Sequence, residues 1–322
     1  MKTHGLPGRI HLFGTPGEEG HDGGKIKLLQ AGAYDDISVT LISHPGILHN
    51  SALVRTTAFC RLEVEYFGKA AHGAASPWEG INALDALVNA YNAVSMLRQQ
   101  TMPGDIIGMH ITHGGSAPNI IHAYAAGAFV LRSQTAKRLG DLKGKVEACL
   151  RAGAEATGAR VSIKVVEGYK DHVPNIPLAA SYTSYFTTMP EPPPPRMSSP
   201  TASHFTYIAA STDQGDLSYA LPSINASFSI EPPPEGGGPH SRGFEAAAGT
   251  RGAFERALRV GVALAGTAVD VLASPKLLVR IREAWEKDMQ KARPTMRVTA
   301  DGEDISQVEL HYVMGKSRDS NQ

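Results

Sequence analysis

The pattern of apolar and polar positions divides the chain into stretches with different periodicity. Between residues 9 and 57, apolar runs alternate with a helical pattern. Residues 9–13 and 37–42 are predicted strands, and residues 25–30 form a predicted short helix that Gly32 ends. This alternation predicts βαβ construction with a mostly parallel sheet.

A second pattern covers residues 58–168. Residues 60–66 alternate with period two, which is typical of a strand with one solvated face. Residues 76–79 resemble a capping box with proline at the first helical position, and apolar residues continue at helical spacing to Val94. Further elements are predicted as strand 106–112, strand 123–131, helix 135–157 and strand 160–166. The order β-α-β-β-α-β predicts a ferredoxin-like unit.

The rest of the chain returns to an α/β pattern. The proline-rich residues 189–195 predict an exposed connector, residues 205–230 short strands, and residues 244–272 one long helix. We therefore predict an α/β fold in which one domain is interrupted by the ferredoxin-like insert. The predicted boundaries are 1–57 for the first part of that domain, 58–168 for the insert, 169–292 for its second part and 293–322 for a polar, poorly ordered or peripheral tail.

Composition limits the partners of the protein. Its 31 Lys and Arg residues balance 31 Asp and Glu residues, which argues against binding to nucleic acid or a membrane surface. No run of about eighteen apolar residues and no signal-type start occurs, so we expect a cytoplasmic location. Cys60 and Cys149 are too few for a disulfide framework or an all-cysteine zinc site, but the 13 histidines leave histidine–carboxylate metal sites open.

Carboxylates and histidines follow the predicted strands. Glu18 and Glu19 come after strand 9–13, at a position where α/β sheets place ligands. One of them can bind a metal while the other stays free as a general base, although a solvated turn is the alternative. His44 and His240 are predicted at the same sheet edge, with exposed loop histidines as the alternative. These side chains suit zinc, manganese or cobalt.

Six segments occur in the order seen in the family-twenty metallopeptidases, which include aminoacylase and glutamate carboxypeptidase. The pattern is most similar to the amidohydrolase branch, near aminobenzoyl-glutamate hydrolase and the β-alanyl-lysine dipeptidase. The resemblance extends to about residue 290. The segments are Gly14 to Gly20, Ser43 to Gly46, Gly68 to Ala83, Pro118 to Ile121, Ser211 to Gly215 and Pro239-His240.

The resemblance implies a two-zinc catalytic domain with an inserted dimerisation, or lid, domain that makes a homodimer. Glu18 matches the general base, and Glu19, His44 and His240 match metal ligands. His72 matches a lid histidine that reaches the partner subunit's site and stabilises the oxyanion.

Two further residues match positions near the substrate in these relatives. Asn119 matches a lid asparagine, with a turn residue after Pro118 as the alternative. Arg132 matches an arginine that helps to hold the substrate carboxylate, with a solvated charge at a strand end as the alternative.

The start of the chain departs from the family pattern. Relatives carry an upstream Cys-Gly-His-type motif that supplies another metal histidine and the bridging ligand, and nothing of that kind precedes Gly14. We therefore expect a catalytic domain that is incomplete at its N-terminus. The expected function is metal-dependent hydrolysis of small N-acyl amino acids or dipeptides, impaired in this chain. The alternative is a noncatalytic dimerising or regulatory relative.

Overall fold

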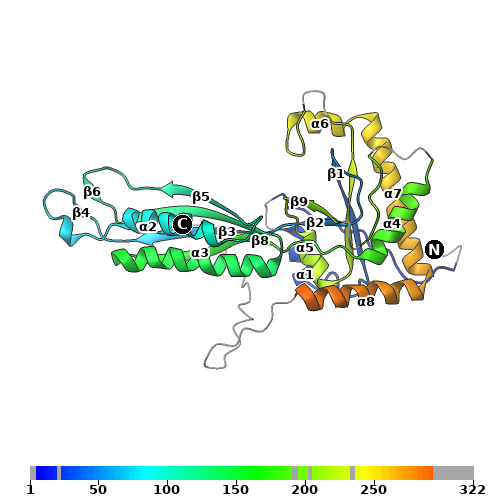
Figure 1. Ribbon diagram of the computed structural model, residues 1–322, viewed down its shortest axis with the longest axis horizontal. Coiled ribbons are helices and arrows are strands. Elements are labelled where there is room, and N and C mark those ends of the chain that lie inside the picture. Colours follow the sequence, from blue (N-terminus) through cyan, green and yellow to red (C-terminus); the bar gives the residue numbers. More distant parts are fainter. Residues whose placement is uncertain (1–4, 20–22, 191–194, 202–204, 233–235, 293–322) are drawn as a thin grey trace, which may run out of the picture. The chain divides into compact units, whose positions relative to one another are not determined.

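The computed structural model describes residues 5–19, 23–190, 195–201, 205–232 and 236–292. The chain divides into two compact units (Figure 1). Among the described residues, unit 1 contains those up to Ala58 and from Tyr169 to Lys291, and unit 2 contains Phe59 to Gly168. The predicted tail 293–322 lies outside the described residues, as does part of the predicted connector 189–195.

Unit 2 is a four-stranded sheet in the order β5-β7-β3-β8, with helices α2 and α3 packed on each other and against β7 (Figure 1). The predicted β-α-β-β-α-β order is confirmed. A two-residue antiparallel pair, β4 with β6, adds to it. The elements are β3 (Ala58–Phe67), β4 (Ala71–His72), α2 (Ala83–Leu97), β5 (Ile106–His113), β6 (Ile120–Ile121), β7 (Tyr124–Ser133), α3 (Ala136–Thr157) and β8 (Arg160–Tyr169).

Alternation and capping explain the elements of unit 2. In β3, Leu62, Val64 and Tyr66 are buried while the residues between them are exposed or half-buried. The side chain of Thr135 accepts a hydrogen bond from the backbone of Arg138 and so caps α3.

The predicted start of α2 at Pro77 was wrong. Residues Pro77–Glu79 form only a 3₁₀ turn, and the Ser76 side chain makes no capping hydrogen bond. The backbones of Lys69 and Ile81 exchange two hydrogen bonds, which hold the chain extended after that turn. Helix α2 therefore begins at Ala83, where Asn82 accepts a hydrogen bond from the backbone of Leu84.

Unit 1 contains two parallel strand pairs. Strand β1 (Thr40–Gly46) pairs with β10 (Ser223–Ser229), and β2 (Val54–Thr56) pairs with β9 (Thr206–Ile208). Both pairs are parallel, as predicted, but their partner strands come from the second part of the chain and not from residues 9–13. The helices of unit 1 are α1 (Gly24–Gln30), α4 (Ile176–Thr188), α5 (Gln214–Ala220), α6 (Arg242–Ala248), α7 (Arg251–Ala273) and α8 (Pro275–Ala292).

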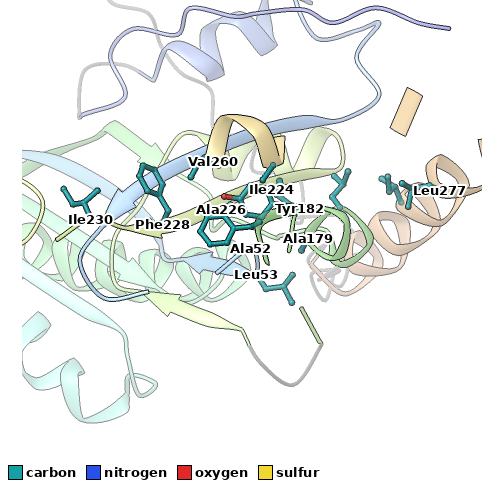
Figure 2. Close-up of a cluster of buried hydrophobic side chains, with 14 of the residues drawn as sticks. Ala52, Leu53, Ala179, Tyr182, Ile224, Ala226, Phe228, Ile230, Val260 and Leu277 are labelled. Carbon is teal, nitrogen blue, oxygen red and sulfur yellow. The ribbon is translucent and has the colours of Figure 1, made fainter. Parts of the chain in front are cut away.

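Strand β10 supplies the centre of the unit 1 core. Its apolar residues Ile224, Ala226 and Phe228 belong to one cluster with Tyr182 of α4 and Val260 of α7 (Figure 2). The alternate residues of β10 are polar and are also buried, as Ser223 and Asn225 illustrate. This strand therefore has one apolar face and one buried polar face.

Two predictions for unit 1 were wrong. Residues 9–13 are not a strand: Ile10 and Leu12 are 64% and 99% exposed, and among the described residues no strand pairs with this segment. An apolar run without a pairing strand has no hydrogen-bonded ladder to join. The predicted helix 244–272 is two helices, because the chain breaks at Gly249 and Thr250 caps the start of α7.

Within the described ranges, no single helix is both long and apolar enough to cross a membrane. Helices α7 and α8 reach that length and apolar content only when taken together, and they are bent by 104° at the break between them.

Candidate functional site

The turn that carries Glu18 and Glu19 lies in unit 1, immediately before α1. Glycines shape it: Gly17 has a positive φ of 74°, and its carbonyl oxygen accepts a hydrogen bond of 3.1 Å from the backbone of Gly23. The Glu18 side chain is half-buried and that of Glu19 is exposed. Because residues 9–13 form no strand, the turn does not follow a strand end, contrary to the prediction.

The two predicted metal-binding histidines occupy different elements: His44 lies within β1, opposite Ser227 of β10, and His240 lies in the loop just before α6. The Nδ1 atom of His44 lies 2.7 Å from the carbonyl oxygen of Pro45. Since a carbonyl can only accept, Nδ1 carries the proton and the lone pair of the neutral ring is on Nε2, as in histidines that bind metals. His240 has a φ of 72°, the one positive value for a residue other than glycine among the described residues.

The structure brings together two of the three predicted metal ligands. The Nε2 atom of His240 lies 3.6 Å from a carboxylate oxygen of Glu19, and both side chains are largely exposed. No group of three or more His, Cys, Asp or Glu side chains with metal-binding geometry occurs in the described part of the chain. A catalytic zinc normally takes three protein ligands. The described residues therefore fit a ligand pair and not a complete zinc site.

In unit 2, pairing of β4 with β6 brings His72 close to Asn119. His72 is opposite Ile120 in the register, and the backbone of the next residue, Gly73, donates a 2.9 Å hydrogen bond to the carbonyl oxygen of Asn119. Both predicted residues are exposed at the end of the unit that carries β4 and β6 (Figure 1).

The tautomer of His72 is set by its own loop. Its Nδ1 atom accepts hydrogen bonds from the backbone N–H groups of Ala74 and Ala75, at 3.2 Å and 3.1 Å. Nδ1 must therefore be unprotonated, which leaves Nε2–H as the donor of the neutral ring. A ring held in this way offers a single N–H group to an external acceptor.

Arg132 lies away from that pair, near the other end of β7. Eight residues of extended strand separate it from Tyr124, which corresponds to about 26 Å. Its guanidinium is stacked over the ring of Phe59, 4.6 Å from the centroid, and burial lowers its pKa while Glu167 opposes the change. The sequence left two interpretations of Arg132 open, carboxylate binding and a solvated charge at a strand end. Neither predicted its contact with the ring of Phe59.

Sequence reasoning missed a buried polar network in unit 1. Asp213 is fully buried and accepts hydrogen bonds from both the backbone and the Nζ atom of Lys25, at 3.0 Å and 2.7 Å. Burial raises the pKa of the neighbouring Asp216 to about 6, although Lys170 opposes this change. His172 donates to Val54 and accepts from Ser223, and burial lowers its pKa to about 4. Asp213 lies within one of the family-like segments, but the pattern gave no role for it.

Comparison with known proteins shows that the chain is similar to peptidases. Residues 56–158 match the family model of the M20 peptidase dimerisation domain. Mouse Xaa-Arg dipeptidase is 36% identical over 289 residues, which are 88% of this chain and 64% of the mouse protein. The chain is a homologue of Xaa-Arg dipeptidase and contains an M20 peptidase dimerisation domain. Its α/β fold with a dimerisation domain agrees with the predicted fold and family.

Other relatives are more distant. The p-aminobenzoyl-glutamate hydrolase of Escherichia coli has a subunit that is 27% identical over 54% of this chain and 36% of that protein. A dinuclear metal-binding peptidase of the M20 family from Bacillus subtilis shares the fold, with a TM-score of 0.56 and 15% identity over 80% of this chain and 64% of that one. The chain thus spans less than two thirds of these relatives.

Proposed function

We propose that this protein hydrolyses amide bonds in dipeptides or N-acyl amino acids. The observation that carries the proposal is the family-like turn of Glu18 and Glu19, in which Glu19 lies 3.6 Å from His240. The proposal is also supported by the 36% sequence identity of the chain to mouse Xaa-Arg dipeptidase. In the proposed reaction Glu18 acts as the general base, takes a proton from the attacking water and passes it to the leaving amine.

His72 has the geometry for the oxyanion role. Because Ala74 and Ala75 fix its Nδ1 atom as an acceptor, Nε2–H is free to donate to the oxygen that becomes negative during attack. We propose that it does so in the partner subunit's site, with Asn119 beside it. We also propose that Arg132, which lies near the C-terminal end of β7, binds the substrate carboxylate.

We propose a metal site with few protein ligands. Zinc, with cobalt or manganese as substitutes, would bind at Glu19 and His240, and His44 would supply a ligand to a second ion. The described residues gather only the first two, so we propose that these 322 residues alone turn substrate over slowly.

We also propose a homodimer formed through unit 2, at the edge where α2 lies beside β5. Within the described residues strand β5 pairs only with β7, so its outer edge has unused backbone groups. Arg98, just after α2, donates a 2.9 Å hydrogen bond to the carbonyl oxygen of Ile107 and so ties helix to strand. Val88 and Tyr91 expose apolar surface on α2, as does Ile106 on β5. A second copy would bury this surface.

The hydrolase proposal is tested with a panel of dipeptides that end in arginine or lysine, in the presence of zinc. We expect measurable but slow hydrolysis that falls at least about 100-fold in Glu18→Gln, because that change removes the base. Glu245→Gln, an exposed glutamate on α6, is the matched control and should have no effect. Hydrolysis that survives Glu18→Gln unchanged would contradict the proposal.

A noncatalytic dimerising protein is the second candidate, and one observation favours it: residues 56–158 match a dimerisation domain, whereas no three-ligand group gathers in the described residues. A stable dimer with no hydrolysis of any substrate in the panel would support this candidate. For location we propose the cytoplasm, since Cys60 and Cys149 are both free thiols.

A further inference from the structure

The two ends of the Glu18–Glu19 turn meet at a narrow neck of backbone. The N–H group of Gly23 donates to the carbonyl oxygen of Gly17 at 3.1 Å. Gly24 packs directly on Pro16, so that a Cβ atom at Gly24 would overlap the carbonyl oxygen of Pro16. The neck thus depends on glycine, and its position fixes where the turn begins and ends.

Two side chains from distant parts of the sequence hold this neck. The hydroxyl of Tyr169 donates a 3.1 Å hydrogen bond to the carbonyl oxygen of Glu18. A Cβ atom placed on Gly23 would lie 3.2 Å from the ring of Tyr169 and 3.4 Å from Cβ of Asp213, so both side chains pack against this glycine. Tyr169 and Asp213 therefore contact the neck at the same residue.

The Lys25–Asp213 ion pair anchors the far end of the neck. Helix α1 starts after Gly23, which has no side chain to cap it, and its first turn contains no acidic residue. The Asp213 carboxylate accepts the backbone N–H of Lys25 and pairs with its ammonium group, both in buried surroundings. It thus places a negative charge at the start of α1, where the helix dipole favours one.

We propose that Tyr169, supported by the Lys25–Asp213 pair, is a positioning residue for Glu18 and Glu19. Its hydroxyl fixes the backbone of Glu18, and this fixes the direction in which Glu19 faces His240. The proposal rests on the proposed function, because the turn matters for chemistry only if Glu18 is the base. Tyr169 acts through the backbone of the turn, so it is not itself a catalytic residue.

The test compares Tyr169→Phe with Tyr219→Phe. Each change removes one hydroxyl from unit 1, but the Tyr219 hydroxyl donates to the carboxylate of Asp171 and not to the Glu18 carbonyl. Backbone amide hydrogen exchange is followed in the peptide that carries the neck. We expect exchange to become about three- to tenfold faster in Tyr169→Phe, as loss of one hydrogen bond allows, and to stay unchanged in Tyr219→Phe.

A second measurement separates positioning from general stability. The proton resonance of the His240 ring carbon Cε1 reports on the nearby carboxylate, and Glu19→Gln shows the direction in which loss of that carboxylate moves it. We expect Tyr169→Phe to move the resonance in the same direction, without a change in thermal midpoint larger than that of Tyr219→Phe. A purely structural role of Tyr169 would lower the midpoint and leave the His240 resonance in place.

The outcomes distinguish this proposal from the proposed function. Equal exchange at the neck in both variants would overturn the positioning role even if the wild-type chain hydrolyses dipeptides. Faster exchange and a shifted His240 resonance in Tyr169→Phe alone would support it even if the wild-type chain hydrolyses nothing, in which case only the proposed function fails.

Discussion

Units 1 and 2 differ in how they are assembled from the sequence: unit 2 is one continuous stretch, whereas unit 1 combines two separate stretches. The stretch that forms unit 2 has about a hundred residues. It forms a four-stranded sheet against which two helices pack. Unit 1 joins residues from both ends of the chain: Thr40 of β1 pairs with Ser223 of β10. Its described strands form only two-stranded pairs, and the apolar residues Phe254, Leu258 and Val262 are exposed along α7.

The difference shows what each unit depends on. Unit 2 is one continuous stretch of sequence, in which periodicity and caps predict each main strand and helix. The contacts of unit 1 are long-range, and they include buried polar groups that must find their partners. We therefore expect unit 1 to be the more sensitive of the two to the loss of a single partner.

The largest effect is expected at Asp213. Asp213→Ala leaves the ammonium group of Lys25 buried without its partner, which should lower the free energy of unfolding by about 3 to 5 kcal/mol. The double variant Lys25→Met with Asp213→Leu should recover most of this loss, because it replaces both charges. Urea denaturation followed by circular dichroism measures both variants.

The matched change in unit 2 is Asp105→Ala, which removes the partner of the less buried Arg138. It should cost clearly less than Asp213→Ala. A cost as large as that of Asp213→Ala would break the distinction between the two units.

The second prediction concerns assembly through unit 2. Tyr91→Asp places a charge on the exposed apolar face of α2 and should weaken the dimer at least about 100-fold. Val279→Asp makes a similar change on the exposed surface of α8 in unit 1 and should leave the dimer intact. Sedimentation equilibrium gives both dissociation constants, and a dimer lost with Val279→Asp alone would move the interface to unit 1.

The third prediction uses the titrating groups of unit 1. Buried His172, with a pKa of about 4, stays neutral in the folded state, while the unfolded chain takes up a proton near pH 6.5. Its contribution to stability is therefore complete above pH 6.5 and is lost as the pH falls toward 4. Asp216 acts in the opposite sense, because its pKa rises from 3.8 to about 6 on folding, so stability falls as pH rises through that window.

Asp216→Asn should therefore steepen the gain in stability between pH 4 and pH 6.5, and His172→Gln should flatten it. Each change in stability across the window is at most about 3 kcal/mol. Urea denaturation at four pH values measures the slopes. Identical slopes in the wild type and both variants would remove these groups from the account of unit 1.

The smallest effect is expected at the start of α2. Asn82→Ala removes the capping oxygen and should cost about 1 kcal/mol, whereas Ser76→Ala, at the position that the sequence pattern favoured, should cost almost nothing. Thermal denaturation compares the two variants. The reverse order would restore the predicted capping box at Ser76.

The contrast between units also explains which predictions succeeded. Every main element of unit 2 followed from local patterns, but the cap was misplaced because the bridge between Lys69 and Ile81 is a tertiary feature. In unit 1 the apolar run 9–13 was interpreted as a strand, since periodicity cannot show whether a pairing strand is present. The short helix α1 was predictable from the alternating pattern, and so was the parallel direction of the strands, but their partners in residues 206–229 were not.

The candidate site was predictable in part. Residue types and family-like segments identified Glu19 and His240, which the fold brings together. They did not identify Tyr169 or Lys25, because a hydroxyl that binds a backbone carbonyl leaves no motif in the sequence. The tautomer of His72 likewise depends on the backbone of Ala74 and Ala75, which only the folded loop defines.

Unit 2 carries the match to a dimerisation domain, whereas the described residues of unit 1 gather only a pair of the proposed metal ligands. Equilibrium dialysis of the purified dimer against zinc tests this claim most directly. We expect no tightly bound zinc: one ion binds weakly and is lost in Glu19→Gln, and a second ion at His44 binds more weakly still. Two tightly held zinc ions per subunit in the wild-type chain would contradict this expectation.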